Sequence, residues 1–529
     1  MKPVDPPSVA KLVRHARNRM ASAAISAGLA LGLAGHVQGG NAHHVVVVVW
    51  DGMRPDFITE ATTPNLFQLS RRGVFFQNHH PVFVSSTEVN GTAIATGCHP
   101  QSSGLIANKE FRPAIDPLRI IATEDLRTVR KGDLLENGHY LQRATVAEIL
   151  RAQGMKTAIA GSKPVALLHD RAERDHASTS QLVYEGETLP TSLKATLVEK
   201  LGPMPSANPG KTARDEWTTR ALMEVLWHDG VPPYSLLWLA EPDATQHRTS
   251  PGSVDSLAAI RGSDARLGDV IQELSRQKML QDTDILVVSD HAFSTCTEGI
   301  DVAVELSQAG FTTARGLTTS SNPDTVLVGG LGGCVALSVP SHNPEVVDRL
   351  VRHLQTTPYA GVLFSRTAIE GTFPMDTVQI QTTNAPDVLV AFRWNSQTNG
   401  FGTTGGVYVE GTLTSPAGTH ASLSHYDMHN TLVAAGPDFR QGVFDPLPSG
   451  NTDLAPTILW ILGVQPPQPM DGRVLSEALT VPGPRLESVD FQQLTARRTL
   501  DSGTWSQTLN VSRLNGVAYF DEGNGGIQK

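Results

Sequence analysis

The 529-residue sequence predicts an α/β fold with a mostly parallel central sheet. The first observation is that three apolar runs, "HHVVVVVWDG", "PYSLLWLAEPD" and "TDILVVSDH", each end in acidic or histidine residues. Continuous apolar runs are typical of strands buried on both faces of a parallel sheet. The second observation is that stretches with helical features alternate with the apolar runs, as in βαβ units. Open parallel sheets bind ligands at the carboxyl ends of their strands, so the same runs predict the position of a functional site.

The first elements follow in chain order. The run that ends at Asp51 predicts a buried strand. The next stretch, "TTPNLFQLSRRG", has Pro64 in its first turn and Gly73 at its end, which predicts a helix. Residues 145–162, "TVAEILRAQGMKTAIAGS", predict a helix followed by a strand. The helical stretch over residues 253–278 then leads to the third apolar run.

The rest of the chain predicts one large domain over residues 43–480 and a small C-terminal unit. Residues from about 295 to 412 are rich in Gly, Thr and Val and contain alternating segments such as "GGCVALSVP". This pattern predicts a mixed insertion and sheet edge rather than a separate domain. The Pro-rich stretch "QPPQPMDGRVLSEAL" closes the large domain, and residues 481–529 predict a β appendage of short strands.

The first 42 residues predict an export signal. Several Lys and Arg residues precede the apolar stretch "MASAAISAGLALGLAG", and small residues follow it up to Ala42. The apolar stretch is shorter than the roughly 20 residues of a membrane span, and no later stretch is long enough. We therefore expect a periplasmic or secreted mature protein without a membrane span. An uncleaved N-terminal anchor is the alternative.

Charge and cysteine content exclude two classes of site. The formal net charge is -10 and no basic run follows residue 20, which argues against a stable nucleic-acid partner. The three cysteines, Cys98, Cys296 and Cys334, form no CxxC pair. The sequence therefore predicts neither a thiolate metal site nor a disulfide framework, and at most one disulfide.

Metal-binding side chains follow the predicted strands. Asp243 and His247 are four residues apart in "EPDATQH", so one helical turn would aim both at the same point. Asp290 and His291 are neighbours at the end of the third run and would converge only at an irregular turn. The full set of candidates is Asp51, Thr87, Asp243, His247, Asp290, His291 and His420.

This set predicts two metal ions. Its three carboxylates and three imidazoles are too many for one tetrahedral ion but fit two ions with mixed oxygen and nitrogen ligands. Zinc suits that mixture best, because magnesium and calcium prefer oxygen ligands alone, although other divalent metals stay open. Each residue alone has an ordinary structural interpretation, such as Thr87 as a helix cap. The prediction depends on their joint occurrence at strand ends.

The motifs resemble the alkaline phosphatase superfamily, and within it the nucleotide pyrophosphatase/phosphodiesterase (type I phosphodiesterase) branch. "VVVVVWDGMRPD", "FVSSTEVN", "EPDATQH", "VVSDHAFS" and "GTH" occur in the family's order within residues 45–480. The resemblance implies an alkaline phosphatase-like three-layer α/β/α sandwich and zinc at both metal sites. It assigns one ion to Asp51, Thr87, Asp290 and His291, and the other to Asp243, His247 and His420.

The resemblance also implies a reaction. Thr87 attacks phosphorus in line and forms a phosphothreonine, which is then hydrolysed. The family's Thr-x-x-Asn pattern falls on Thr87 and Asn90, and we expect Asn90 and the main-chain N–H of Thr87 to donate to a phosphate oxygen. Ser85 and Ser86 are then supports. The expected activity is that of a phosphohydrolase acting on a small phosphate ester.

The charged residues near Thr87 indicate which class of phosphate ester the site accepts. No Arg or Lys lies between Thr87 and Lys109, which favours a diester over a dianionic monoester unless a basic group comes from elsewhere. Glu88 stands where the nucleotide-hydrolysing branch usually has an aromatic residue, which argues against a second phosphate. A phosphomonoesterase, a phosphonate hydrolase or a phospholipid headgroup diesterase are the alternatives. Sulfatase activity through Cys98 is disfavoured, because Ser102 replaces the arginine of that signature.

Two further interpretations complete the hypothesis. A non-catalytic binding protein on the same fold is disfavoured, because every ligand and the nucleophile are present. Among the other histidines, His79, His80 and His425 are expected to be structural or surface residues. His429 is expected to support a ligand rather than to bind metal itself.

Overall fold

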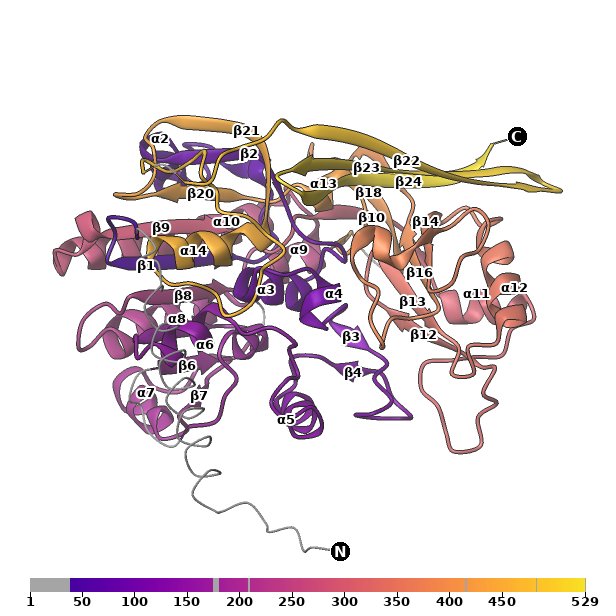
Figure 1. Ribbon diagram of the computed structural model, residues 1–529, viewed down its shortest axis with the longest axis horizontal. Coiled ribbons are helices and arrows are strands. Elements are labelled where there is room, and N and C mark those ends of the chain that lie inside the picture. Colours follow the sequence, from indigo (N-terminus) through magenta and orange to yellow (C-terminus); the bar gives the residue numbers. More distant parts are fainter. Residues whose placement is uncertain (1–38, 175–179, 208–209, 414–415, 482, 529) are drawn as a thin grey trace, which may run out of the picture.

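The computed structural model describes residues 39–174, 180–207, 210–413, 416–481 and 483–528. Its centre is a nine-stranded sheet with the strand order β21-β2-β20-β9-β1-β8-β5-β6-β7 (Figure 1). The parallel strands are β9 (Thr283–Val288), β1 (His44–Trp50), β8 (Tyr234–Leu239), β5 (Thr157–Gly161) and β6 (Ser180–Tyr184). The three apolar runs of the sequence are therefore strands of a parallel sheet, as predicted, and the structure places them next to one another.

The edges of this sheet are mixed. On one side, β20 (Leu432–Ala435) is antiparallel to β9, and β2 (Val74–His80) is antiparallel to β20. The outermost strand there, β21 (Val443–Gly450), is parallel to β2. On the other side, β7 (Glu187–Leu189) is antiparallel to β6. The central strands are thus covered laterally as well as on both faces.

Alternate residues of β1 pack on opposite faces of the sheet. Val45, Val47 and Val49 belong to an apolar cluster with α3 (Thr87–Thr96), α6 (Val146–Ala152) and α14 (Leu454–Ile461). Val46, Val48 and Trp50 belong to a second cluster with α2 (Pro64–Arg72), α8 (Thr212–Arg220) and α10 (Val254–Arg276). Helices therefore cover both faces, and the predicted three-layer α/β/α fold is confirmed.

Local sequence explains where these helices begin. Ser253 caps α10, since its side chain accepts a hydrogen bond from the N–H of Ser256. Thr145 and Glu148 form a capping box at the start of α6. Further α-helices are α4 (Pro100–Ser103), α5 (Leu126–Leu135), α7 (Leu193–Leu201), α9 (Asp243–Thr249) and α13 (His425–Met428). A small antiparallel pair of strands consists of β3 (Lys109–Glu110) and β4 (Ile121–Ala122).

The segment between β9 and β20 forms a second lobe with its own apolar core (Figure 1). A six-stranded sheet contains β11 (Thr313–Ala314), β12 (Val326–Gly330), β13 (Cys334–Ser338), β16 (Val388–Phe392), β14 (Ala360–Ser365) and β15 (Phe373–Pro374). A four-stranded sheet contains β17 (Trp394–Thr398), β18 (Thr404–Glu410), β10 (Ser294–Ile300) and β19 (Gly418–Thr419). The helices are α11 (Val302–Gln308) and α12 (Pro344–Leu354). These described strands form sheets of their own and do not extend the edge of the nine-stranded sheet, which differs from the expectation.

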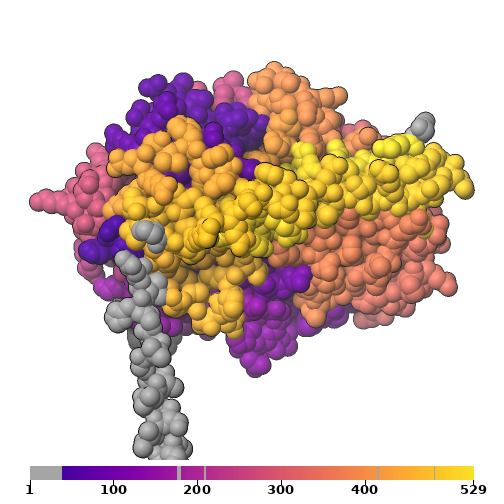
Figure 2. Space-filling model, turned by 45° about the horizontal axis from the view of Figure 1, so that its top comes forward, coloured from indigo at the N-terminus to yellow at the C-terminus, as the bar shows by residue number. Residues whose placement is uncertain are grey.

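The C-terminal residues form a three-stranded antiparallel sheet of β22 (Asp490–Leu500), β23 (Gly503–Leu514) and β24 (Val517–Gln528). Its strands are longer than the sequence suggested, and Figure 2 shows them as a yellow band along the surface. Phe520 of β24 shares an apolar cluster with Phe83, which precedes the nucleophile candidate, and with Phe364 of the second lobe. The C-terminal sheet therefore packs on both lobes.

Three sequence-based expectations concern other parts of the chain. The export signal over residues 1–42 lies, apart from its last four residues, outside the described part of the chain. No described helix is long and apolar enough to cross a membrane. Cys98, Cys296 and Cys334 are all free and buried, and burial raises the pKa of the Cys98 thiol to about 11.

A buried carboxyl pair lies at the opposite, amino-terminal side of the sheet. Asp284 on β9 accepts a hydrogen bond from the N–H of Asp438 at 3.2 Å, while the Asp438 carboxylate accepts from the N–H groups of Asn41 and Ala42. Burial and, next, the neighbouring Asp438 raise the pKa of Asp284 to about 9. The unfolded carboxyl titrates near pH ~3.9, so the folded state binds an extra proton and stability falls as pH rises between about 4 and 9.

Replacing this carboxyl by an amide removes that pH dependence. We expect Asp284→Asn to match the wild-type Tm near pH 4 and to exceed it by about 2 to 6 °C at pH 8. Thermal unfolding at pH 4, 6 and 8 measures the difference. Asp282→Asn, at an exposed neighbouring position, is the control. A Tm difference that does not change with pH would contradict the assignment.

Candidate active site

The carboxyl ends of three adjacent strands bring three aspartates together. Asp51 follows β1, Asp243 follows β8 and Asp290 follows β9, and all three are buried. Gly52 makes the turn after β1 with a φ of 72°, and its N–H donates to Asp290 Oδ1 at 3.0 Å. A Cβ atom at Gly52 would lie 2.9 Å from the Phe293 ring, so this turn requires glycine.

The hydroxyl of Thr87, the first residue of α3, faces this cluster. Thr87 Oγ1 lies 3.3 Å from His291 Nε2. His291 Nε2 lies 3.7 Å from Asp51 Oδ1 and 3.3 Å from Asp290 Oδ2. The structure therefore brings together the four residues Asp51, Thr87, Asp290 and His291.

A second group shares the Asp243 carboxylate. Asp243 Oδ1 lies 3.2 Å from His247 Nε2 and 3.7 Å from His420 Nε2. Ligand atoms of these three residues lie within 4.8 Å of one another, as do those of Asp51, Asp243 and His291. The rings of His291 and His420 are stacked with centroids 3.7 Å apart. All seven predicted residues thus converge on one site, in which six are buried and the His247 side chain is 42% exposed.

The three histidines have the same orientation relative to the main chain. The Nδ1 atoms of His247, His291 and His420 lie 3.1, 3.0 and 2.9 Å from the carbonyl oxygens of Gly418, Ala292 and Ser85. A carbonyl only accepts, so Nδ1 carries the proton and, in each neutral ring, the Nε2 lone pair faces the carboxylates. Metal-binding histidines are commonly oriented in this way. Burial alone would lower the pKa of His247, but Asp243, 3.2 Å from its Nε2, outweighs burial and raises the pKa of that imidazole. The arrangement therefore offers a set of nitrogen and oxygen ligand atoms for a cation.

Unpaired carboxylate oxygens and shifted pKa values characterise the buried part of the site. Asp51 Oδ1, Asp243 Oδ1 and Asp290 Oδ2 are buried and accept no hydrogen bond from a described residue. Burial raises the pKa of Asp51 well above its usual range and that of Asp290 to about 7. Burial also lowers the pKa of His291 to about 3. The donor set, with its unpaired oxygens and Nε2 lone pairs, fits divalent metal ions.

Lys163 is a site residue that the sequence analysis missed. Its Nζ lies 2.8 Å from Asp51 Oδ2, 3.0 Å from Asp243 Oδ2 and 3.4 Å from Thr87 Oγ1. Burial alone would raise the pKa of Asp243, but Lys163 and His247 hold it well below its usual range. The Lys163 ammonium thus balances part of the negative charge of the Asp51 and Asp243 carboxylates. Since Lys163 follows β5 in "AGSKP", the strand-end rule that found the aspartates could have found it.

The expected role of Asn90 is corrected by its contacts. Its Nδ2 donates to the carbonyl oxygens of Val82, Val84 and Ser86, and its Oδ1 accepts from the N–H of Val82 at 2.8 Å. These bonds fix the loop before the nucleophile and engage the amide hydrogens that were expected to bind phosphate. Asn90 therefore positions the loop. Ser85 acts as the expected support, because its carbonyl oxygen accepts from the His420 ring.

Asn108 is a second residue that the sequence analysis missed. Its Oδ1 accepts a hydrogen bond from the N–H of Glu88 at 3.1 Å, which places the side chain beside the first turn of α3. No described residue accepts from its Nδ2, so this donor is available to a ligand. Asn108 comes 21 residues after Thr87, and no local pattern in the sequence indicates that the two are neighbours.

Glu88, the residue after Thr87, is buried. Burial and, next, the nearby Glu124 raise its pKa well above the usual range. The expectation that Glu88 disfavours a second phosphate stays a prediction.

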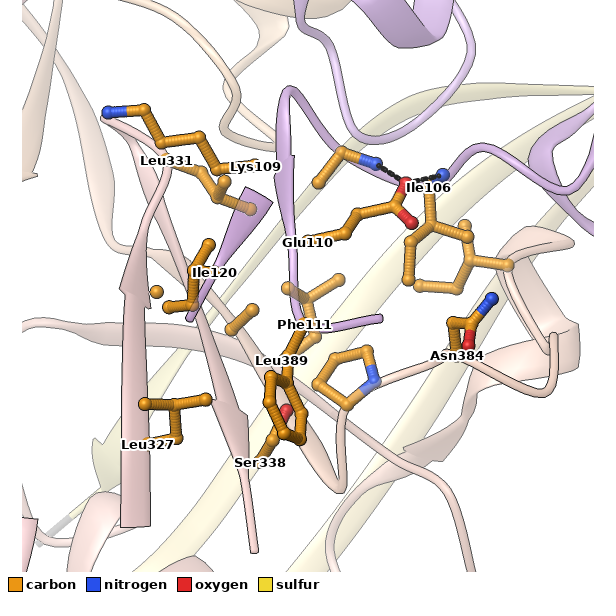
Figure 3. Close-up of a pocket in the computed structure, with 15 residues that line it drawn as sticks. Ile106, Lys109, Glu110, Phe111, Ile120, Leu327, Leu331, Ser338, Asn384 and Leu389 are labelled. Carbon is orange, nitrogen blue, oxygen red and sulfur yellow. Dashed lines mark hydrogen bonds between the residues drawn. The ribbon is translucent and has the colours of Figure 1, made fainter. Parts of the chain in front are cut away.

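An apolar pocket lies beside the loop that carries Asn108 (Figure 3). Ile106, Leu327 and Leu389 line it, so it lies between this loop and the six-stranded sheet of the second lobe. Glu110 closes the loop by accepting hydrogen bonds from the N–H groups of Ile106 and Ala107 at 2.6 and 3.0 Å. None of the seven converging residues lines this pocket, so it is separate from the polar site.

Comparisons with known proteins identify a family and its relatives. The family model described as "Type I phosphodiesterase / nucleotide pyrophosphatase" matches residues 45–405. The bis(5'-adenosyl)-triphosphatase enpp4 of Mus musculus is 21% identical over 460 residues, which are 83% of this chain and 82% of that protein. The ectonucleotide pyrophosphatase/phosphodiesterase family member 5 of Homo sapiens is 24% identical over 266 residues, 50% of this chain and 47% of that protein.

A solved structure shares the fold. Inactive murine ectonucleotide pyrophosphatase/phosphodiesterase 5 in complex with AMP superposes with a TM-score of 0.59 and 18% identity. The superposition covers 83% of this chain and 100% of that chain. At this level of identity, the likeness shows the fold.

The position of Lys163 predicts a metal-dependent stability effect. Lys163→Met leaves Asp51 and Asp243 without their cationic partner, and breaking a buried ion pair costs about 3 to 5 kcal/mol. We expect the Tm of the chelator-treated variant to fall by several degrees, and the zinc-loaded variant to lose less because Zn²⁺ supplies the charge. Thermal unfolding with EDTA or Zn²⁺ measures both, with the exposed Lys109→Met as control. Equal losses in the two conditions would overturn this explanation.

Proposed function

Because the chain belongs to the type I phosphodiesterase/nucleotide pyrophosphatase family and is therefore a hydrolase of phosphodiester or pyrophosphate bonds, we propose that it acts through Thr87 and two zinc ions. The observation that carries the proposal is the convergence of the Thr87 hydroxyl with three buried carboxylates and three imidazole Nε2 atoms. Such a donor set, with both oxygen and nitrogen, favours zinc over magnesium or calcium.

The ligands divide naturally between two ions. One ion is proposed to bind Asp51, Thr87, Asp290 and His291, and the other Asp243, His247 and His420. When bound, the metal ions lower the pKa of the Thr87 hydroxyl and neutralise charge on the phosphate oxygens. The carbonyl groups of Ser85, Ala292 and Gly418 hold the three imidazoles in the orientation that this binding needs.

The residues around Thr87 support an in-line displacement. The Thr87 hydroxyl releases its proton to solvent and Oγ forms a bond to phosphorus, while the bond from phosphorus to the leaving oxygen breaks and that oxygen takes up a proton from solvent. The N–H of Thr87 at the amino end of α3 and the Nδ2 of Asn108 are placed to donate to a phosphate oxygen. Water then cleaves the bond between phosphorus and Oγ, which restores the threonine and releases the second product.

We propose that the substrate is a small phosphate ester, nucleotides included, that the enzyme encounters in the periplasm or outside the cell. One relative is named a bis(5'-adenosyl)-triphosphatase, which supports a nucleotide substrate. The basic and apolar N-terminal segment supports export to the periplasm or secretion.

A second candidate function is supported by Lys163. The preference for a diester was based on the absence of a basic group near Thr87, whereas the Lys163 ammonium lies 3.4 Å from its hydroxyl. A cation at this distance favours a phosphate that carries two negative charges. A phosphomonoesterase or phosphonate hydrolase therefore stays as the alternative use of the same site.

The nucleophile is tested by Thr87→Ala. We expect hydrolysis of bis-p-nitrophenyl phosphate to fall by more than about a thousandfold, since the attacking oxygen is removed. Zinc content should change little, because the other ligands remain. Thr92→Ala, which removes a buried hydroxyl from the same helix, should keep its activity. Acid-quenched wild-type enzyme should yield a phosphopeptide that contains Thr87, and its absence together with an active Thr87→Ala variant would refute the proposal.

The role of Lys163 is tested by comparing two substrates. If its ammonium binds the phosphate, Lys163→Met should lower kcat/KM for p-nitrophenyl phosphate about tenfold more than for bis-p-nitrophenyl phosphate, because a charged hydrogen bond is worth about 1.5 to 3 kcal/mol. Lys109→Met is the matched control. Equal losses on both substrates would show that Lys163 does not select the phosphate charge, and the monoester alternative would lose its support.

A further inference from the structure

A second group of imidazole and carboxylate side chains lies outside the active site. His80 is the last residue of β2, His429 follows α13, and Asp521 lies on β24. One ligand atom from each of the three lies within 4.8 Å of the others. None of these residues belongs to the seven that converge at Thr87. They come from three segments that are far apart in the sequence, so the fold, and not local spacing, brings them together.

The hydrogen bonds of the two histidines fix their proton positions. His80 Nδ1 lies 3.0 Å from the carbonyl oxygen of Ser449, and His429 Nδ1 lies 3.0 Å from that of His425. Because carbonyl oxygens only accept, both Nδ1 atoms carry protons and both neutral rings have their lone pair on Nε2. This is the same arrangement as that of the three active-site histidines. It is the orientation in which metal-binding imidazoles are commonly held.

The two Nε2 atoms face oxygen atoms that have no proton to donate. His80 Nε2 lies 3.1 Å from Asp521 Oδ1, and His429 Nε2 lies 3.1 Å from Asn78 Oδ1. Ser512 Oγ donates to the Asp521 carboxylate, at 2.9 Å from each oxygen, and so fixes its orientation. The three clustered side chains offer two nitrogens and a carboxylate oxygen, a mixed donor set that suits zinc with a water molecule as its fourth ligand.

The surroundings allow an ion to enter and then to be held. The His80 side chain is 1% exposed and the Asp521 side chain 21%, while His429 is partly exposed. The cluster thus has a buried side and an open side. The ring centroids of His80 and His429 are 4.7 Å apart, which holds the two imidazoles together before any ion binds.

We propose that His80, His429 and Asp521 bind a third divalent transition-metal ion of the zinc class, distinct from the two at Thr87. The ion links the C-terminal sheet, through β24, to the edge of the nine-stranded sheet, through β2. An ion that joins segments so distant in the chain stabilises the folded state, because the unfolded chain cannot form the site. The competing interpretation is a metal-free ion pair between protonated His80 and Asp521.

Zinc stoichiometry tests the site. The full-length protein is stripped with chelator, reloaded with Zn²⁺, and its metal content is measured by mass spectrometry of the ions together with calorimetric titration. We expect three Zn²⁺ per wild-type chain and two in Asp521→Asn. His429→Gln, at a partly exposed position, should also bind two and guards against a folding defect in the first variant. Glu522→Gln, the neighbouring acidic residue on β24, is the matched control and should bind three.

A second comparison distinguishes zinc bound at the proposed third site from zinc bound at the active site. Asp243→Asn removes a carboxylate shared by the catalytic ligands, and adding Asp521→Asn to it should lower the zinc content by one further ion. Zn²⁺ should also raise the Tm of Asp243→Asn more than that of the double variant. Unchanged stoichiometry in Asp521→Asn and His429→Gln, in both backgrounds, would overturn the proposal and favour the ion pair.

Discussion

Three buried carboxylates need positive charge close to them, and this requirement determines which side chains surround them. Asp51, Asp243 and Asp290 stand at the ends of adjacent parallel strands, where the backbone leaves no freedom to move them apart. Desolvated like charges at this distance are unfavourable, as the raised pKa values of Asp51 and Asp290 show. The Lys163 ammonium supplies part of the positive charge that the carboxylates need. The nitrogen lone pairs of the imidazoles increase this need, because they too face a cation favourably. The arrangement therefore suits a site that binds cations.

The imidazoles depend on main-chain carbonyls from three different places. Ser85 belongs to the loop before α3, Ala292 follows β9, and Gly418 begins the short strand β19 of the second lobe. The second lobe therefore contributes to the candidate metal site through its backbone and through His420. The loop before α3 is in turn held by Asn90, whose amide replaces the missing regular hydrogen bonds of that segment.

Much of this site could be predicted from the sequence, because the apolar runs mark strands and the residues after them mark the carboxyl edge of the sheet. Asp51, Asp243 and Asp290 were found in this way, and the helical stretch expected over residues 253–278 corresponds to α10. Lys163 was missed because its strand, β5, is short and mostly alanine and glycine, and its charge did not fit the expected pattern. The sequence could not show which of Asn90 and Asn108 has an amide available to a phosphate. Side-chain partners depend on how loops meet in three dimensions and not on distance along the chain.

The shared apolar cluster of Phe83 and Phe520 has a consequence for the order of folding. The loop that precedes the nucleophile is synthesised early, yet part of its packing comes from a strand more than 400 residues later. Contacts of such long range form slowly, since the ends of a long loop must first be brought together. During synthesis the β1 strand and α3 exist well before β24 does. A growing chain therefore carries an incompletely packed nucleophile loop until its final strands emerge, which delays the assembly of a hydrolytic site until the chain is nearly finished.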